Sequence, residues 1–168
     1  MLSKRIILIV FMMVSACSLH AQNFTLKSYT TADGLPHNNV RTIARDSSGF
    51  LWIGTWDGLT RFDGHEFKNY FHEPDDSTSI PYFSINDICV DRCNNLWICT
   101  DTRELVRYNR GSDDFTAIRS LNGIIPGKIL DISTDPSGNL VLISQSGILI
   151  LDPVHNEVRE IRLTGDDD

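Results

Sequence analysis

Grouped lysine and arginine residues are missing from this sequence. Its 15 basic residues are scattered along the chain and are outnumbered by 22 acidic ones, which gives a formal charge of −7 at pH 7. Nucleic-acid binding depends on clustered basic side chains that neutralise phosphates. We therefore expect no nucleic-acid partner for this chain.

Long apolar runs and helical patterns are also missing. The apolar run near the start covers only residues 6–14, whereas a helix that spans a bilayer needs about 20 residues. No stretch of normal helix length repeats its apolar residues every 3.6 positions. The apolar fraction of 41% is nevertheless ordinary for a folded protein. We expect a folded chain without a transmembrane helix, built from strands.

Recognisable ligand and catalytic sets are absent as well. The histidines after residue 21 are His37, His65, His72 and His155, and none lies at zinc-ligand spacing from another. No glycine-rich phosphate loop leads from a strand into a helix. We predict no catalytic residues, no metal site and no cofactor, and therefore no enzyme activity in this chain.

The first 21 residues carry the pattern of an export signal. Lys4 and Arg5 precede the apolar run, small residues follow it, and Ala21 offers a cleavage position before Gln22. We predict that residues 1–21 are a signal peptide and that the protein is periplasmic. The stretch ending at Cys17 also resembles a bacterial lipobox, so a lipoprotein anchored through Cys17 stays open as an alternative.

A repeat of about 45 residues dominates the rest of the sequence. Residues 40–55, 85–100 and 129–144 align without gaps. Three sets of residues coincide in this alignment: Asp46, Asp91 and Asp135; Leu51, Leu96 and Leu140; and Trp52, Trp97 and Val141. A period near 45 with four short strands per unit is typical of a β-propeller blade.

Each unit carries the turn signals of four short strands. In the first unit, Asp-Ser-Ser-Gly at 46–49 forms a turn, residues 50–55 are rich in aromatic and β-branched side chains, and Trp-Asp-Gly at 56–58 leads into a third strand. The sequence therefore predicts an all-β fold made of four-stranded antiparallel β-propeller blades. Trp52 and Trp97 lie inside strands and are expected in the core.

The predicted blades cover about residues 40–71, 85–118 and 129–161 of a partial β-propeller at 22–168. Residues 24–29 match the fourth strand of each unit and are expected to form an orphan outer strand. Propellers close with about 4–8 blades, so three blades make an incomplete ring. This predicts a truncated sequence, completed by its remaining blades, or an assembly with another copy of the chain.

Three cysteines remain after the predicted signal peptide. Cys89, Cys93 and Cys99 occupy positions at which the first repeat has Ala44, Ser48 and Gly54. Replacement of one small residue by another explains them, and a Cys89–Cys99 disulfide stays open because the predicted compartment is oxidising.

The first repeat resembles a known family. Residues 34–40 and 46–63, which include Gly-Phe-Leu-Trp-Ile-Gly-Thr at 49–55, are similar to the two-component regulator propeller repeat; the second repeat is similar to a lesser degree and the third least. The resemblance implies the first blades of the periplasmic sensor of a Bacteroidetes hybrid two-component system. Such sensors detect glycan breakdown products and control polysaccharide-utilisation genes through a kinase and a DNA-binding domain, neither of which lies in these residues.

A ligand site is expected on one face of the ring. In a four-stranded blade, the turns between second and third strands and the links between blades share that face. The sequence predicts that an oligosaccharide binds there, with an exposed tryptophan stacking on a sugar ring and polar groups bonding its hydroxyls. The predicted residues are His37, Asn38, Trp56, Asp57, Asp101, Arg103 and Gln145. Trp56 also belongs to the repeat, so packing between blades is the alternative role for it.

Two other functions remain open at this stage. A propeller lyase or hydrolase would need acid and base groups that meet at the ring axis, and His72 and His155 are not at equivalent blade positions. The other alternative is a surface lipoprotein interaction module that is anchored through Cys17.

Overall fold

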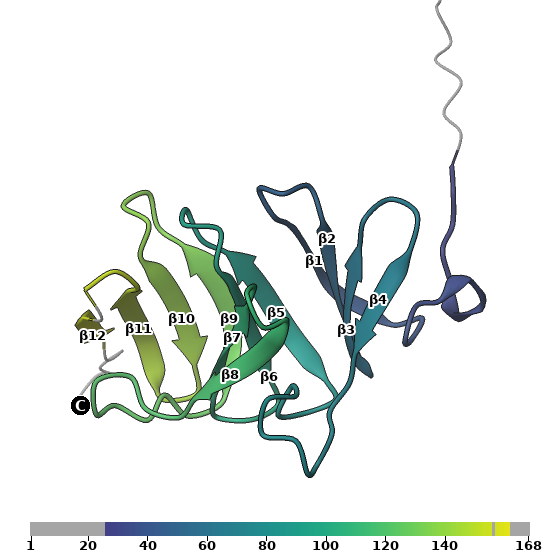
Figure 1. Cartoon of the computed structure of the whole chain (residues 1–168). Coiled ribbons are helices and arrows are strands. Elements are labelled where there is room, and N and C mark those ends of the chain that lie inside the picture. Colours follow the sequence, from purple (N-terminus) through teal and green to yellow (C-terminus); the bar gives the residue numbers. More distant parts are fainter. Residues whose placement is uncertain (1–25, 156, 162–168) are drawn as a thin grey trace, which may run out of the picture.

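The computed structural model describes residues 26–155 and 157–161. In this part of the chain, twelve strands form three antiparallel sheets of four strands each, without an α-helix (Figure 1). None of the described residues belongs to a helix long and apolar enough to cross a membrane. The predicted signal peptide and Cys17 lie outside the described residues.

Each sheet is one repeat of the sequence. Blade 1 contains β1 (Val40–Arg45), β2 (Leu51–Thr55), β3 (Gly58–Phe62) and β4 (Phe67–Tyr70). Blade 2 contains β5 (Ile85–Val90), β6 (Leu96–Thr100), β7 (Leu105–Asn109) and β8 (Asp114–Ile118). Blade 3 contains β9 (Ile129–Thr134), β10 (Leu140–Ser144), β11 (Gly147–Asp152) and β12 (Glu157–Ile161).

The strands are arranged as in a β-propeller. Within every blade the spatial order follows the chain order, and β5 contacts β1 on one side and β9 on the other. The first strand of each blade is therefore innermost, and the sheets lie face to face in an arc (Figure 1). The predicted all-β propeller fold with an incomplete ring is confirmed.

The recurring aspartate holds the first turn of each blade. Oδ1 of Asp46 accepts a hydrogen bond from the backbone N–H of Phe50 at 3.1 Å. Oδ2 of the same residue accepts from the indole Nε1 of Trp52 at 2.9 Å. Asp91 and Trp97 repeat the second bond at 2.9 Å. The Asp–Trp pair therefore joins a buried indole to a tight turn, which explains why both residues recur.

The third blade keeps this turn without a tryptophan. Val141 stands at the indole position, and the amide Nδ2 of Asn139 donates to Oδ2 of Asp135 at 2.8 Å. The backbone N–H of Asn139 donates to Oδ1 at 2.9 Å. Blade 2 has the same amide bond, from Nδ2 of Asn95 to Oδ2 of Asp91 at 2.8 Å, so blade 3 keeps the amide donor and lacks only the indole.

The core lies between the blades. Faces of blades 1 and 2 enclose an aromatic cluster around Trp52, Tyr70, Tyr108 and Phe115. Faces of blades 2 and 3 enclose an aliphatic cluster that contains the buried Trp97. Each blade thus buries its apolar residues against the neighbouring blade, as the units of other stacked repeat proteins do.

The segment before β1 packs on the outer face of blade 1. The ring of Tyr29 lies 5.2 Å from that of Phe62 and 5.3 Å from that of Phe67, measured between centroids. Residues 26–30 form no strand, and residues 24 and 25 lie outside the described part. A strand needs a hydrogen-bonded neighbour, and none of the described strands pairs with this segment, so the orphan outer strand at 24–29 stays a prediction.

Cysteines 89 and 99 are free thiols in adjacent strands. Cys89 pairs with Trp97, and Cys99 pairs with Asp87, so the two cysteines are diagonal neighbours, whose separation is typically about 7–8 Å. A disulfide requires Cα atoms within about 7 Å. Burial raises the pKa of Cys89 to about 11. The register therefore favours two small, protonated packing residues.

Candidate functional site

Three predicted site residues occupy one repeated position. Trp56, Asp101 and Gln145 each follow the last residue of the second strand of their blade. The N–H of Trp56 donates to the carbonyl of Asn39 at 3.2 Å, and that of Gln145 donates to the carbonyl of Lys128 at 3.0 Å. These bonds join the turn to the link that precedes the blade. The backbone arrangement is therefore the same in both blades, while the side chain at this position differs.

Hydroxyl groups hold the same turns in shape. Thr55 Oγ1 donates to the carbonyl of Gly58 at 2.9 Å, and Ser144 Oγ donates to the carbonyl of Gly147 at 2.9 Å. Gly58 has a φ of +107°, and a Cβ there would lie 2.7 Å from the carbonyl oxygen of Tyr70. The glycine in the Trp-Asp-Gly sequence is therefore required both for its backbone conformation and for space.

Trp56 stands in an exposed aromatic patch. Its side chain is 54% exposed, and Phe71 and Phe83 are each 46% exposed. Both phenylalanines adjoin the same turn: the carbonyl of Phe83 accepts from the N–H of Gly58 at 2.7 Å, and the ring of Phe71 lies against Gly58. The two phenylalanines were not among the predicted site residues: Phe71 ends the predicted first blade at 40–71, and Phe83 lies in the link between blades.

Asp101 belongs to a polar chain on the inner rim. Its carboxylate forms an ion pair with Lys128 at 2.8 Å. The hydrogen bond from Lys128 lowers the pKa of Asp101 against the opposing effect of burial. Nearby, Nη1 of Arg41 donates to Oδ1 of Asn86 at 2.9 Å and to Oγ of Ser84 at 3.1 Å. These groups join the inner ends of the three blades.

His37 and Asn38 use their side chains locally. Nδ1 of His37 accepts from the N–H of Asn39 at 2.9 Å, and Oδ1 of Asn38 accepts from the N–H of Thr31 at 2.8 Å. Asp57 is exposed in the Trp-Asp-Gly turn. The structure thus brings Asp57 and Trp56 together and engages His37 and Asn38 with the segment before β1.

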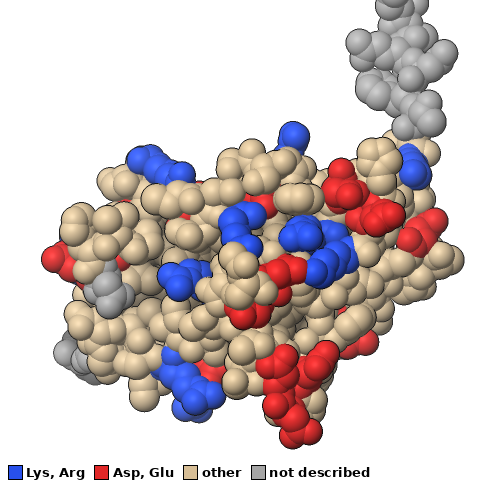
Figure 2. All heavy atoms as spheres, in the orientation of Figure 1, with Lys and Arg blue, Asp and Glu red and all other residues tan. Residues whose placement is uncertain are grey.

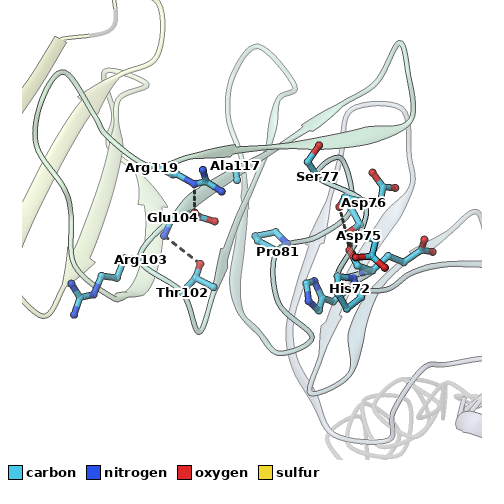
Figure 3. Close-up of a pocket in the computed structure, with 13 residues that line it drawn as sticks. His72, Asp75, Asp76, Ser77, Pro81, Thr102, Arg103, Glu104, Ala117 and Arg119 are labelled. Carbon is cyan, nitrogen blue, oxygen red and sulfur yellow. Dashed lines mark hydrogen bonds and ion pairs between the residues drawn. The ribbon is translucent and has the colours of Figure 1, made fainter.

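A pocket of about 520 Å³ lies between blade 2 and the link that follows β4 (Figure 3). One wall comes from residues 72–81 of the link, and the other comes from the turn at 102–104 and from Ala117 and Arg119. Arg103 is the only predicted site residue among those that line it. Glu104, Ala117 and Arg119 were missed, since only packing of blade 2 against the link reveals them.

The link wall is fixed by its own hydrogen bonds. The ring Nδ1 of His72 lies 2.8 Å from the carbonyl oxygen of Ile80, and Ser79 Oγ accepts from the N–H of Glu73 at 3.0 Å. The carbonyl of Thr78 accepts from the N–H of Phe115 in β8 at 2.8 Å. The pocket is therefore preformed, although its wall is a loop.

Metal binding finds no support in the described residues. No group of three or more histidine, cysteine, aspartate or glutamate side chains in that part of the chain could hold a metal ion. The pocket offers carboxylate, guanidinium, hydroxyl and imidazole groups, which suit a polar organic ligand.

Comparison with known proteins gives a family match for part of the first repeat. The family described as two component regulator propeller matches residues 34–57. A 67-residue stretch, 39% of this chain, is 55% identical to "Histidine kinase P4" of Formosa agariphila and corresponds to 5% of that protein.

Solved structures agree with the fold. The extracellular domain of BT3049, assigned to the hybrid two component systems of B. thetaiotaomicron, is 26% identical, with a TM-score of 0.71 over 81% of this chain and 20% of that chain. Virginiamycin B lyase from Staphylococcus aureus has a TM-score of 0.58 at 16% identity, over 79% of this chain and 44% of that chain, which shows a shared fold alone.

The chain therefore spans about a fifth of the BT3049 domain and a twentieth of the kinase that it matches. The family match at residues 34–57 agrees with the three four-stranded blades and with the Asp–Trp turn, since all three indicate a β-propeller. The chain has a β-propeller fold, and its residues 34–57 match the family described as two component regulator propeller.

Proposed function

We propose that this chain is the ligand-sensing propeller segment of an extracytoplasmic two-component sensor, and that its ligand is an oligosaccharide. The likeness to the extracellular BT3049 domain, with a TM-score of 0.71 at 26% identity, carries the sensor part of the proposal. The segment itself is non-enzymatic. Polysaccharide-utilisation genes would be controlled through kinase and DNA-binding parts elsewhere in the protein.

The oligosaccharide part rests on the ring face. Sugar rings present apolar C–H faces that stack on aromatic side chains, and their hydroxyls bond carboxylates, amides and guanidinium groups. Trp56, Phe71 and Phe83 offer exposed rings on this face. The pocket of about 520 Å³ falls in the range of about 300–1,000 Å³ that holds small ligands.

The export signal predicted at residues 1–21 supports a periplasmic location. A lipid anchor at Cys17 would keep the same propeller at a membrane surface, so it changes the location and not the ligand. Incorporation of radiolabelled lipid into the wild-type protein, and its loss in Cys17→Ser, distinguishes the two.

Binding of oligosaccharides to the purified chain tests the proposal. We expect Trp56→Ala to weaken binding of the best ligand from a panel of polysaccharide breakdown products at least tenfold in calorimetry. Val154→Ala is the control, since Val154 is 71% exposed but lies in the β11–β12 turn on the opposite face. A chain that binds no oligosaccharide in the panel, or a Trp56→Ala variant that binds as tightly as wild type, would contradict the proposal.

A further inference from the structure

The pocket between the link and blade 2 has an uneven distribution of charge. Four carboxylates line it, from Glu73, Asp75, Asp76 and Glu104, against the two guanidinium groups of Arg103 and Arg119. In the space-filling view, acidic side chains gather on the projection at the lower edge, where Figure 1 places the link between β4 and β5 (Figure 2). The link therefore forms an acidic wall.

One pair of charges on the opposite wall cancels. Nε of Arg119 lies 2.7 Å from Oε1 of Glu104, and this ion pair is drawn in Figure 3. Arg103 extends away from the link in the same view. The positive charges of the pocket are thus either neutralised or directed outward, and the link wall determines the sign of the field inside.

The carboxylates of the link differ in whether they already accept hydrogen bonds. Oδ1 of Asp76 accepts from the hydroxyl of Thr78 at 2.6 Å and from its N–H at 2.8 Å, and these bonds lower the pKa of Asp76. Among the described residues, no hydrogen bond or ion pair involves the carboxylates of Glu73 and Asp75. Two acceptor groups on a fixed wall are therefore available to a ligand.

We infer that this pocket binds a glycan with a free amino group, a hexosamine unit, in preference to neutral sugars, and that it rejects uronic acids and sulfated sugars. The inference rests on the proposed function, since it names the class of sugar. An ammonium group donates up to three hydrogen bonds to carboxylates and gains from their charge. A carboxylate or sulfate on the ligand would instead face like charges.

The experiment uses calorimetry on the purified chain to compare three ligands: the trisaccharide of glucosamine, the trisaccharide of N-acetylglucosamine, and the trisaccharide of galacturonic acid. We expect the free amine to bind at least tenfold more tightly than the N-acetylated sugar, and the uronate most weakly. Since the Debye length shortens from about 10 Å at 0.1 M salt to about 3 Å at 1 M, the preference should shrink as salt is added.

A double variant tests the wall. Glu73→Gln with Asp75→Asn should abolish the preference for the amine, whereas Glu66→Gln with Glu157→Gln, which changes the net charge equally on the opposite ring face, should retain it. Circular dichroism establishes that both variants fold. Equal binding of the amine and N-acetylated forms, or preference for the uronate, overturns this inference and leaves the sensor proposal standing; a chain that binds no sugar at all removes the proposed function as well.

Discussion

The two interfaces between blades have different chemistry although the same repeat forms both. Blades 1 and 2 meet through aromatic rings: Trp52 and Tyr108 have centroids 4.7 Å apart, and Tyr70 meets Phe115 edge-on at 5.3 Å. Blades 2 and 3 meet chiefly through leucine, isoleucine and cysteine side chains. Aromatic pairs prefer particular geometries, so the first interface is the more selective in its packing.

Polar contacts sharpen the difference. At the first interface Nη1 of Arg110 lies 2.9 Å from Oδ2 of the buried Asp46. Asp113 accepts from the hydroxyls of Tyr70 at 2.7 Å and Tyr108 at 2.5 Å, and it pairs with Lys68. Charge and hydroxyl groups thus lock blade 1 to blade 2.

The second interface contains two carboxylates side by side. Asp87 accepts from the hydroxyl of Thr42 at 2.7 Å and from the N–H of Ile132 at 3.0 Å. Its hydrogen bond to Asp131 raises the pKa of Asp131, and burial adds to the effect. The backbone geometry is therefore the same in each repeat, but the side chains differ. Ion pairs and hydrogen bonds join blades 1 and 2, whereas the carboxylates of Asp87 and Asp131 repel each other between blades 2 and 3.

Removal of the aromatic anchor should have the largest effect. Trp52 is fully buried, so Trp52→Ala should cost about 3–5 kcal/mol in the free energy of unfolding. Val141→Ala, at the equivalent position of blade 3, should cost about 1 kcal/mol or less because Val141 is only half-buried and is smaller. Urea denaturation measures both, and equal losses would show that the buried indole contributes no more than the half-buried valine at the equivalent position.

Loss of the ion pair should rank second. Arg110→Gln removes the cation from the carboxylate of Asp46, which keeps its bond from Trp52. Because hydrogen bonds to buried charged groups contribute about 1–3 kcal/mol, we expect a loss in that range. Arg107→Gln, an exposed change in β7, is the control and should be neutral within about 0.5 kcal/mol. A neutral Arg110→Gln would mean that the Arg110–Asp46 ion pair does not stabilise the interface.

The pH dependence of stability should distinguish the first interface. Burial opposes ionisation of Asp113, but bonds from Lys68, Tyr108 and Tyr70 outweigh it and lower the pKa of Asp113 to about 2. The stabilisation is present above the unfolded pKa of about 3.9 and is lost as pH falls toward 2. Asp113→Asn should therefore be less stable than wild type at pH 7, with a gap that closes between about pH 4 and 2. A gap that is constant with pH would contradict this assignment.

The smallest expected effect concerns the second interface. A raised pKa in the folded state means that the contribution of Asp131 is favourable at low pH and is lost as pH rises through that pKa. Asp131→Asn removes the repulsion with Asp87, so it should raise the melting temperature slightly at pH 7. Asp57→Asn, at an exposed turn, is the control. A lower melting temperature for Asp131→Asn would show that this carboxylate stabilises the interface.

Most of the blade architecture could be predicted from local signals. The turn at 46–49, the alternation in the strands and the spacing of 45 and 44 residues between aspartates each indicate the same four-stranded unit. The contact between Asp46 and Arg110, which are 64 residues apart, left no such signal, because Arg110 is not part of the repeated pattern. Phe71 and Phe83 adjoin the turn of Trp56 only through contacts at Gly58 in the folded structure, so the turn identified Trp56 but not the two phenylalanines.

The sequence by itself determined the fold class and the face on which the turns gather, because strand periodicity and turn chemistry act over a few neighbouring residues and recur in each repeat. Only the tertiary structure decided that Glu73 and Asp75 face Arg119 and Ala117 across one pocket. The first two residues belong to the link, Ala117 belongs to β8, and Arg119 follows β8. They meet because the carbonyl of Thr78 accepts a hydrogen bond from the N–H of Phe115 when blade 2 packs beside the link. Contacts of this kind depend on how sheets stack, which no local pattern encodes.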